Sequence, residues 1–268
     1  MLLCTKAELS KMDKLKELGY AAIDAAFTGT IYFDDPKPHE PILDDDDYEK
    51  NLDFYIEKSR ELGIEILSSH IPYRYKYLEP DSETFEKCHK MAVRSLKATE
   101  YIGAKWAVMH VTTVEGTVNY VKRLFAESGV KNVGIAIENM SNRPVSELIE
   151  AVDILVSEGY NVGICLDIGH CHQNKFFDND ISEVIKMMGH RIKVLHVHDN
   201  SRGPDVHKAP YMGTVPWERV MPALKEIGFE GALNLELMPN NIPEPAREAY
   251  EQYAVAIGKY LISLYDKA

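Results

Sequence analysis

Six apolar runs in the chain each end in a carboxylate or an imidazole. In the clearest of them, Asn161 to His172 (NVGICLDIGHCH), the apolar residues are followed by Asp167 and, three residues later, by His170. The other five runs end at His70, His110, Glu138, the His196–Asp199 segment and Glu236. Short apolar runs of this kind indicate buried strands. The side chains at their ends are the types that bind divalent metals and transfer protons in enzymes.

The alternation of residue size within two of these runs indicates where the acids point. In Val133–Glu138 and in Val162–Asp167, bulky aliphatic residues alternate with small ones, and the carboxylate belongs to the small series. Successive side chains of a strand point to opposite faces, so the small residues and the acid share one face. In a closed barrel that face is the interior. We therefore expect Glu138 and Asp167 to point inward at the mouth of a barrel.

Strand and helix patterns alternate along the whole chain. Each expected strand is followed by an expected helix, and the strands are placed at Met1–Cys4, Tyr20–Phe27, Ile64–His70, Ala104–Val111, Val133–Glu138, Val162–Ile168, Ile192–His198 and Ala232–Leu237. The helices are placed at Lys6–Leu18, Tyr48–Leu62, Ser82–Ile102, Val118–Ser128, Pro144–Glu158, Ile181–Met188, Pro216–Ile227 and Glu244–Tyr265. Eight βα units predict an α/β protein, a (β/α)8 TIM barrel formed as a single domain by residues 1–268.

Charge and composition argue against several classes of function. The net charge of −12 opposes binding to nucleic acid or to an anionic membrane, and the four cysteines lack CxxC spacing, which favours reduced thiols over disulfides. No apolar segment has the length of a signal peptide core or a membrane span. We expect a cytoplasmic protein without nucleic-acid or membrane partners, and we leave open whether it forms a homo-oligomer.

The strand-end residues taken together favour a metal site. Each of them alone has an ordinary explanation, such as a helix cap or a rim ion pair. As a set, Glu138, Asp167, His196 and Glu236 would give a divalent cation mixed oxygen and nitrogen ligands, which suit Mn²⁺, Zn²⁺, Co²⁺ or Mg²⁺. Further ligand-type groups exceed the needs of one ion and allow a second or third, namely His70, His110, His170, His198, Asp205 and His207. No nucleotide-binding glycine loop is present, and we expect no organic cofactor.

Several of these segments resemble one family. IENM at Glu138, CLDIGH at Asp167, VLHVHDN at His196, DVH at Asp205, PYMGTVPW and LNLEL at Glu236 are similar to the motifs of the xylose-isomerase-like TIM barrel superfamily. That superfamily contains sugar-phosphate isomerases and epimerases, and also endonuclease IV. The resemblance covers most of the chain and is weakest before Leu62.

The likeness to ketose 3-epimerases implies roles for individual residues. One metal would be held by Glu138, Asp167, His196 and Glu236. The two glutamates would also serve as acid and base on opposite faces of a sugar. His170 and Arg202 would hold substrate oxygens, and we count His70, His110 and His198 as further candidates for substrate binding. His196 is preferred to His198 as the metal ligand because the family's metal histidine stands three residues before an acid, here Asp199.

The implied reaction is proton abstraction next to a metal-chelated carbonyl, which passes through an enediolate. We therefore predict a metal-dependent isomerase or epimerase of a small sugar or sugar phosphate. The likeness to endonuclease IV implies an alternative, a zinc-dependent phosphodiesterase on abasic DNA, in which His70, His110, His170, Asp205 and His207 also bind metal. Two further alternatives are a lyase or hydratase acting on oxidised sugars and a binding barrel without turnover.

Overall fold

The computed structural model describes residues 1–27, 42–43, 46–72, 82–176, 180–239 and 242–268. In this part of the chain eight strands alternate with helices. The strands are β1 (Leu3–Ala7), β2 (Ala22–Ala25), β3 (Glu65–His70), β4 (Trp106–His110), β5 (Gly134–Glu138), β6 (Val162–Asp167), β7 (Ile192–His196) and β8 (Leu233–Leu235).

The strands form one parallel sheet that curls into a barrel. Their order is β7-β6-β5-β4-β3-β2-β1-β8, so sequence neighbours pair throughout and β1 also pairs with β8. The two ends of the sheet meet where the Val197 amide donates to the Asn234 carbonyl at 2.8 Å and the Glu236 amide donates to the Val197 carbonyl at 3.2 Å. The predicted (β/α)8 barrel is therefore confirmed.

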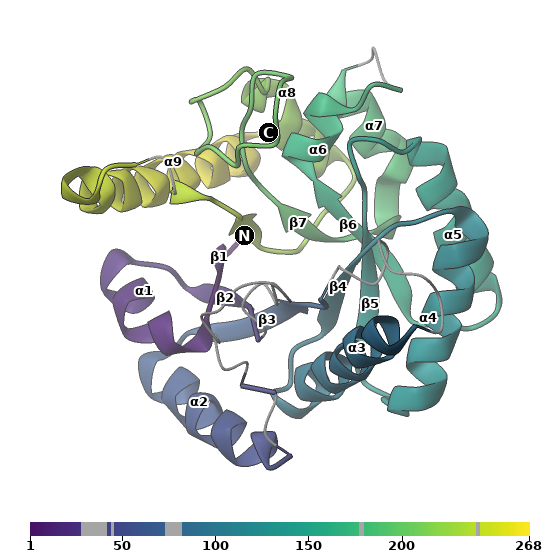
Figure 1. Ribbon diagram of the computed structural model, residues 1–268. Coiled ribbons are helices and arrows are strands. Elements are labelled where there is room, and N and C mark those ends of the chain that lie inside the picture. The colour runs from purple at the N-terminus through teal and green to yellow at the C-terminus, as the bar shows by residue number, and fades with distance from the viewer. Residues whose placement is uncertain (28–41, 44–45, 73–81, 177–179, 240–241) are drawn as a thin grey trace.

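The helices lie around the outside of the strands (Figure 1). They are α1 (Met12–Leu18), α2 (Tyr48–Leu62), α3 (Glu83–Tyr101), α4 (Val114–Ser128), α5 (Val145–Ser157), α6 (Ile168–Gln173), α7 (Ile181–Met188), α8 (Trp217–Glu226) and α9 (Arg247–Lys267). Ser82 and Thr113 cap α3 and α4 by accepting hydrogen bonds from backbone amides. None of the helices in the described ranges combines the length and the apolarity that crossing a bilayer requires.

Apolar side chains form one layer on each face of the curled sheet, as the size alternation predicts. Ile135 and Ile137 of β5 pack in the large layer between sheet and helices. The small residues of the opposite face, Ala136 and Cys165, lie in a separate inner cluster with Val108 and Val194. On β4 to β7, the side chains two residues further along each strand therefore lie above this inner cluster, at the mouth of the barrel.

Several element boundaries differ from the sequence prediction, among them those of the first strand, α1 and α4. The first strand is Leu3–Ala7, not Met1–Cys4, and α1 begins at Met12 after a 3₁₀ turn over Leu9–Lys11. The helical spacing of Leu9, Met12, Leu15 and Leu18 favoured a helix from Lys6. The backbone of residues 5–7 instead pairs with β2, with Lys6 opposite Asp24. Helix α4 also starts earlier than expected, at Val114, and the short helix α6 was not predicted.

Candidate functional site

A ring of polar side chains stands at the carboxyl ends of all eight strands. Its members, in strand order, are Lys6, Asp24, His70, His110, Glu138, Asp167, His196 and Glu236. Each stands two residues beyond an inner residue of the same strand, from Cys4 on β1 to Asn234 on β8, so the pleat points it into the mouth. All except Lys6 are buried. Six of the eight are site residues expected from the sequence, and Lys6 and Asp24 are not among those six.

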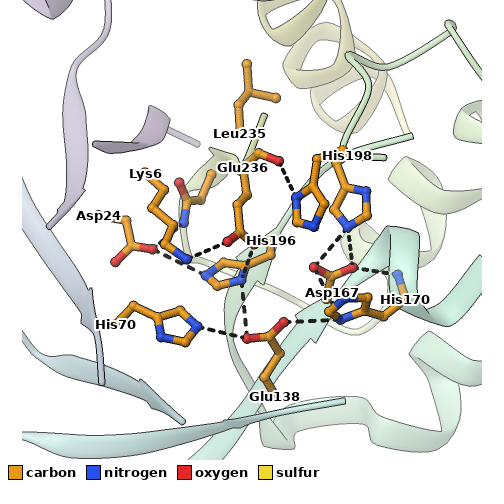
Figure 2. A network of polar contacts seen from close by, with 12 residues as sticks. Lys6, Asp24, His70, Glu138, Asp167, His170, His196, His198, Leu235 and Glu236 are labelled. Carbon is orange, nitrogen blue, oxygen red and sulfur yellow. Dashed lines mark hydrogen bonds and ion pairs between the residues drawn. The ribbon is translucent and has the colours of Figure 1, made fainter. Parts of the chain in front are cut away.

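Glu138 is the hub of one half of the ring. Its Oε2 lies 3.2 Å from His70 Nε2, and its Oε1 lies 3.2 Å from His170 Nδ1 (Figure 2). The same Oε2 lies 3.3 Å from His110 Nε2. The His196 Nδ1 is 3.6 Å from the same Oε2. With its side chain only 1% exposed, this carboxylate is surrounded by imidazoles and shielded from water.

Asp24, His196 and Glu236 form a chain across the other half. Nε2 of His196 contacts Asp24 Oδ2 at 3.3 Å, and Nδ1 lies 2.8 Å from Glu236 Oε2. Asp24 also accepts hydrogen bonds from Ser68 Oγ at 2.8 Å and from Asn234 Nδ2 at 3.0 Å. Asp24 therefore fixes the orientation of the His196 ring and leaves Nδ1 facing the mouth.

Asp167 joins strand β6 to helix α6. Its Oδ1 accepts a hydrogen bond from the His170 amide at 2.6 Å, which caps the helix, and its backbone amide donates to Asn139 Oδ1 at 2.8 Å. On the side away from the helix, His198 Nε2 lies 3.0 Å from Oδ1. Asp167 and His170, which the sequence suggested as a pair for chemistry, are thus also linked by a helix cap.

A second group lies beside the ring. His170 Nε2 is 3.1 Å and His207 Nε2 is 3.2 Å from Asp205 Oδ2. His198 stacks on His207 with ring centroids 3.8 Å apart. The side chain of Asp205 is 42% exposed, so this group opens to solvent more than the ring does.

Arg202 is the predicted site residue that the structure places outside these groups. It is exposed in the segment after β7, where its backbone amide donates to Asn200 Oδ1 at 3.0 Å. The pKa of His172 is lowered mainly by burial of its ring and, to a lesser extent, by the charge of Arg202. A contact between Arg202 and a substrate stays a prediction.

The charges of the ring support one another in spite of burial. Burial alone would raise the pKa of Glu138 and of Glu236, but nearby imidazoles, and Lys6 for Glu236, lower both pKa values well below the usual range. Burial would likewise lower the pKa of His170 and His196, and the surrounding anions instead raise it well above the usual value. In the metal-free state these imidazoles therefore hold protons that a bound cation would displace.

Within the described part of the chain, four sets of side chains bring their donor atoms within 4.8 Å of one another, as a metal site requires. One is Glu138, Asp167, His196 and Glu236, the set expected from the sequence; the others are His70, His110 and Glu138; His170, His198, Asp205 and His207; and Glu138, Cys165 and His196. These groups could hold metal.

The outer nitrogens of the imidazoles test this fit. The Nδ1 atoms of His70, His170 and His207 donate to the carbonyls of Ile71, Asn139 and Glu236 at 2.8, 3.1 and 2.8 Å, which leaves each Nε2 directed at carboxylate oxygens. His196 has the reverse arrangement: Nε2 contacts Asp24, and the buried Nδ1 is directed at Glu236 Oε2. An imidazole fixed through one nitrogen, with the other free for a cation, is typical of metal ligands. The donor set fits a divalent ion.

The model of the family described as xylose isomerase-like TIM barrel matches residues 12–255. The chain belongs to this family. Among its relatives, the protein MJ1311 of Methanocaldococcus jannaschii is 26% identical over 254 residues, which are 85% of this chain and 78% of the relative. A probable endonuclease 4 of Persephonella marina is 25% identical over 177 residues, and the protein y4fM of Sinorhizobium fredii is 26% identical over 183. The matches cover 58% and 62% of this chain and 61% and 58% of those two relatives, less than two thirds of their length.

Several solved structures share the whole fold. A D-tagatose 3-epimerase-like protein superimposes with a TM-score of 0.74 at 20% identity and covers 100% of this chain and 99% of its own. D-psicose 3-epimerase gives 0.72 at 15% identity, with 97% and 99% covered. The IOLI protein with a bound zinc atom gives 0.71 at 19% identity, with 100% and 99% covered. At identities this low, the structural likeness shows the fold alone.

Proposed function

We propose that the protein is a divalent-metal-dependent isomerase or epimerase that acts on a small sugar or sugar phosphate. The observation that carries the proposal is the pair of buried carboxylates, Glu138 from β5 and Glu236 after β8, whose oxygens lie within reach of one cation together with Asp167 and His196. Family membership and the epimerases among the structural neighbours support it. Bound metal would polarise a sugar carbonyl and the adjacent hydroxyl, and so acidify the C–H bond between them.

The two glutamates are suited to proton transfer from opposite sides. Glu138 and Glu236 belong to strands separated by β6 and β7 in the sheet order, and both are held ionised by neighbouring positive groups. One carboxylate would remove the proton next to the carbonyl and the other would return it. Return to the same carbon from the opposite face gives an epimer, and return to the neighbouring carbon gives an aldose–ketose isomer.

The histidines at the mouth are suited to hold sugar oxygens. His170 and His198 lie on either side of Asp167, and His70 and His110 lie on either side of Glu138 Oε2. Imidazoles can donate to hydroxyl and carbonyl oxygens, and their own partners already fix their orientation. The ring, together with His170 and His198 beside it, thus offers both the groups that would move protons and the groups that would bind substrate.

The test is exchange of a substrate proton with solvent. In deuterated water with Mn²⁺ supplied, the wild-type protein should introduce deuterium into one member of a panel of ketoses and ketose phosphates. Glu138→Gln and Glu236→Gln should each abolish the exchange while the fold persists. Glu226→Gln is the matched control, because that carboxylate is exposed and pairs with Lys186 on the surface. Exchange that survives in both ring variants would refute the assigned roles.

Hydrolysis of a phosphodiester at abasic DNA is the second candidate. The observation in its favour is that His70, His110, His170, Asp205 and His207 all fall into metal-type groups beside the central one. The net charge of −12 opposes it, because duplex binding needs positive charge along the phosphates. Incubation with an abasic duplex at low salt separates the two candidates, and product analysis separates both from a lyase or hydratase.

A further inference from the structure

Lys6 places a positive charge directly on one of the proposed metal ligands. Its Nζ lies 2.5 Å from Glu236 Oε1, and Figure 2 shows the side chain reaching from β1 across to that carboxylate. Its pKa reflects two opposed effects, since burial lowers it and the charges of Glu236 and Asp24 raise it more, so the net pKa is above the usual value. Lys6 is the one Lys or Arg among the eight ring residues. It is therefore a fixed cation in a ring otherwise made of acids and imidazoles.

The two oxygens of Glu236 have different partners. Oε1 contacts Lys6, whereas Oε2 lies 2.8 Å from His196 Nδ1, the nitrogen that faces the mouth. A cation held with His196 would approach Glu236 from the Oε2 side. Lys6 would then restrict Glu236 to binding through one oxygen, and an ammonium and a metal ion would share a single carboxylate.

The charge count gives this contact a consequence. The three carboxylates Glu138, Asp167 and Glu236 bring three negative charges to the central set, of which a divalent ion offsets two. Lys6 offsets the third. The charges of the three carboxylates, a divalent ion and the Lys6 ammonium thus sum to zero. A site without net charge tolerates a new negative charge on a bound sugar better than an anionic site does, but the ammonium also repels the metal ion.

We propose that Lys6 is a positioning residue that acts through Glu236: it weakens the binding of the divalent ion and, in return, favours the negatively charged state of the bound sugar. The first half concerns the metal alone. The second half rests on the proposed function. A Lys6 that only held Glu236 in place would have the opposite effect on the metal, because Glu236 would lose its orientation when Lys6 is removed.

The experiment compares Lys6→Met, which keeps the length of the side chain without its charge, with Lys6→Arg. Titration of Mn²⁺ into metal-free protein without sugar should show about tenfold or more tighter binding to Lys6→Met, since removal of a unit charge next to a ligand is worth at least that much in a partly buried site. Lys6→Arg should bind Mn²⁺ as the wild type does. Deuterium exchange into sugar should fall about tenfold or more in kcat for Lys6→Met, with a smaller change in KM, and should recover in Lys6→Arg.

The control is Lys14→Met, which removes a lysine that pairs with Glu251 on the surface between α1 and α9 and should change neither measurement. Unchanged or weaker Mn²⁺ binding by Lys6→Met, in a variant that melts like the wild type, would overturn the proposal. If no sugar exchanges with the wild-type protein, the proposed function fails, but the Mn²⁺ titration still decides the effect on the metal. Tighter metal binding with undiminished exchange would overturn the second half alone.

Discussion

Asp24 allows a direct test of how the ring prepares His196 for a metal. The residue is fully buried and accepts three hydrogen bonds, from Ser68 to Oδ1 and from Asn234 and His196 to Oδ2. In Asp24→Asn the amide oxygen can occupy the position of Oδ2 and keep two of these bonds. Its NH₂ group then faces the Ser68 hydroxyl, which can turn to accept. This substitution therefore removes the charge while it preserves the geometry.

Asp24→Ala removes both charge and geometry. It leaves three buried donors without their acceptor, and each such group costs about 1–3 kcal/mol. It also frees the His196 ring to rotate. Substitution of a carboxylate that orients a metal-binding histidine lowers metal affinity about 10–100-fold, or roughly 1.4–2.7 kcal/mol. We expect Asp24→Asn near the lower limit with a nearly unchanged fold, and Asp24→Ala near the upper limit with clearly reduced stability.

The assay is calorimetric titration of Mn²⁺ into metal-free protein, accompanied by thermal melting of the same samples. Asp153→Asn is the matched control, because this carboxylate is 49% exposed and pairs with Arg191 on the surface. Surface pairs of this kind contribute little to stability. Wild-type Mn²⁺ affinity in both Asp24 variants would show that His196 is not held for a metal in the way its contacts indicate.

Three further outcomes are expected. The pKa of His196 and of His170 is raised in the folded state. In protein freed of metal with EDTA, their contribution to the free energy of unfolding is therefore complete below about pH 6.5, and it declines as the pH rises through the folded-state pKa. The melting temperature in EDTA should accordingly fall above neutral pH, whereas Mn²⁺ affinity should rise over the same range, and the opposite trends would contradict the assignment. Gly169→Ala should disrupt the site, since a Cβ there would lie 1.9 Å from His198 Cε1; circular dichroism should show the fold retained, and Mn²⁺ binding should weaken. Asp205→Asn should lower the number of zinc ions bound per chain, counted by mass spectrometry, without loss of the central one, and an unchanged zinc count would exclude Asp205 as a ligand.

The sequence was sufficient to predict the fold and most of the ring because both follow from local patterns. Strand runs that end in Asp, Glu or His mark the mouth of a parallel barrel, and the size alternation in β5 and β6 gives the direction of Glu138 and Asp167. The inner cluster of Ala136 and Cys165 below these acids agrees with that alternation. Where pattern and structure agree, the relevant contacts lie within one strand.

Contacts between distant segments could not be predicted in the same way. Asp24 and His196 are 172 residues apart, and Lys6 and Glu236 are 230 residues apart. Lys6 was assigned to a helix because the apolar residues that follow it have helical spacing, and no periodicity could show that its backbone pairs with β2. The placement of Arg202 was also beyond the pattern, since its spacing from His196 says nothing about the path of the segment that follows β7.

The choice between His196 and His198 shows what the structure adds to a pattern. Both side chains are fully buried and lie on the same face, two residues apart, so strand parity cannot separate them. They differ in what holds them. His196 is fixed through Nε2 by Asp24 and directs Nδ1 to Glu236, whereas His198 directs Nε2 to Asp167 and stacks against His207. A carboxylate that accepts a hydrogen bond from one imidazole nitrogen raises the basicity of the other nitrogen, whereas ring stacking does not. His196, held by Asp24, is therefore the better metal ligand of the two. The geometry thus favours His196 in the central set, and it places His198 where it would serve the second group or a substrate oxygen.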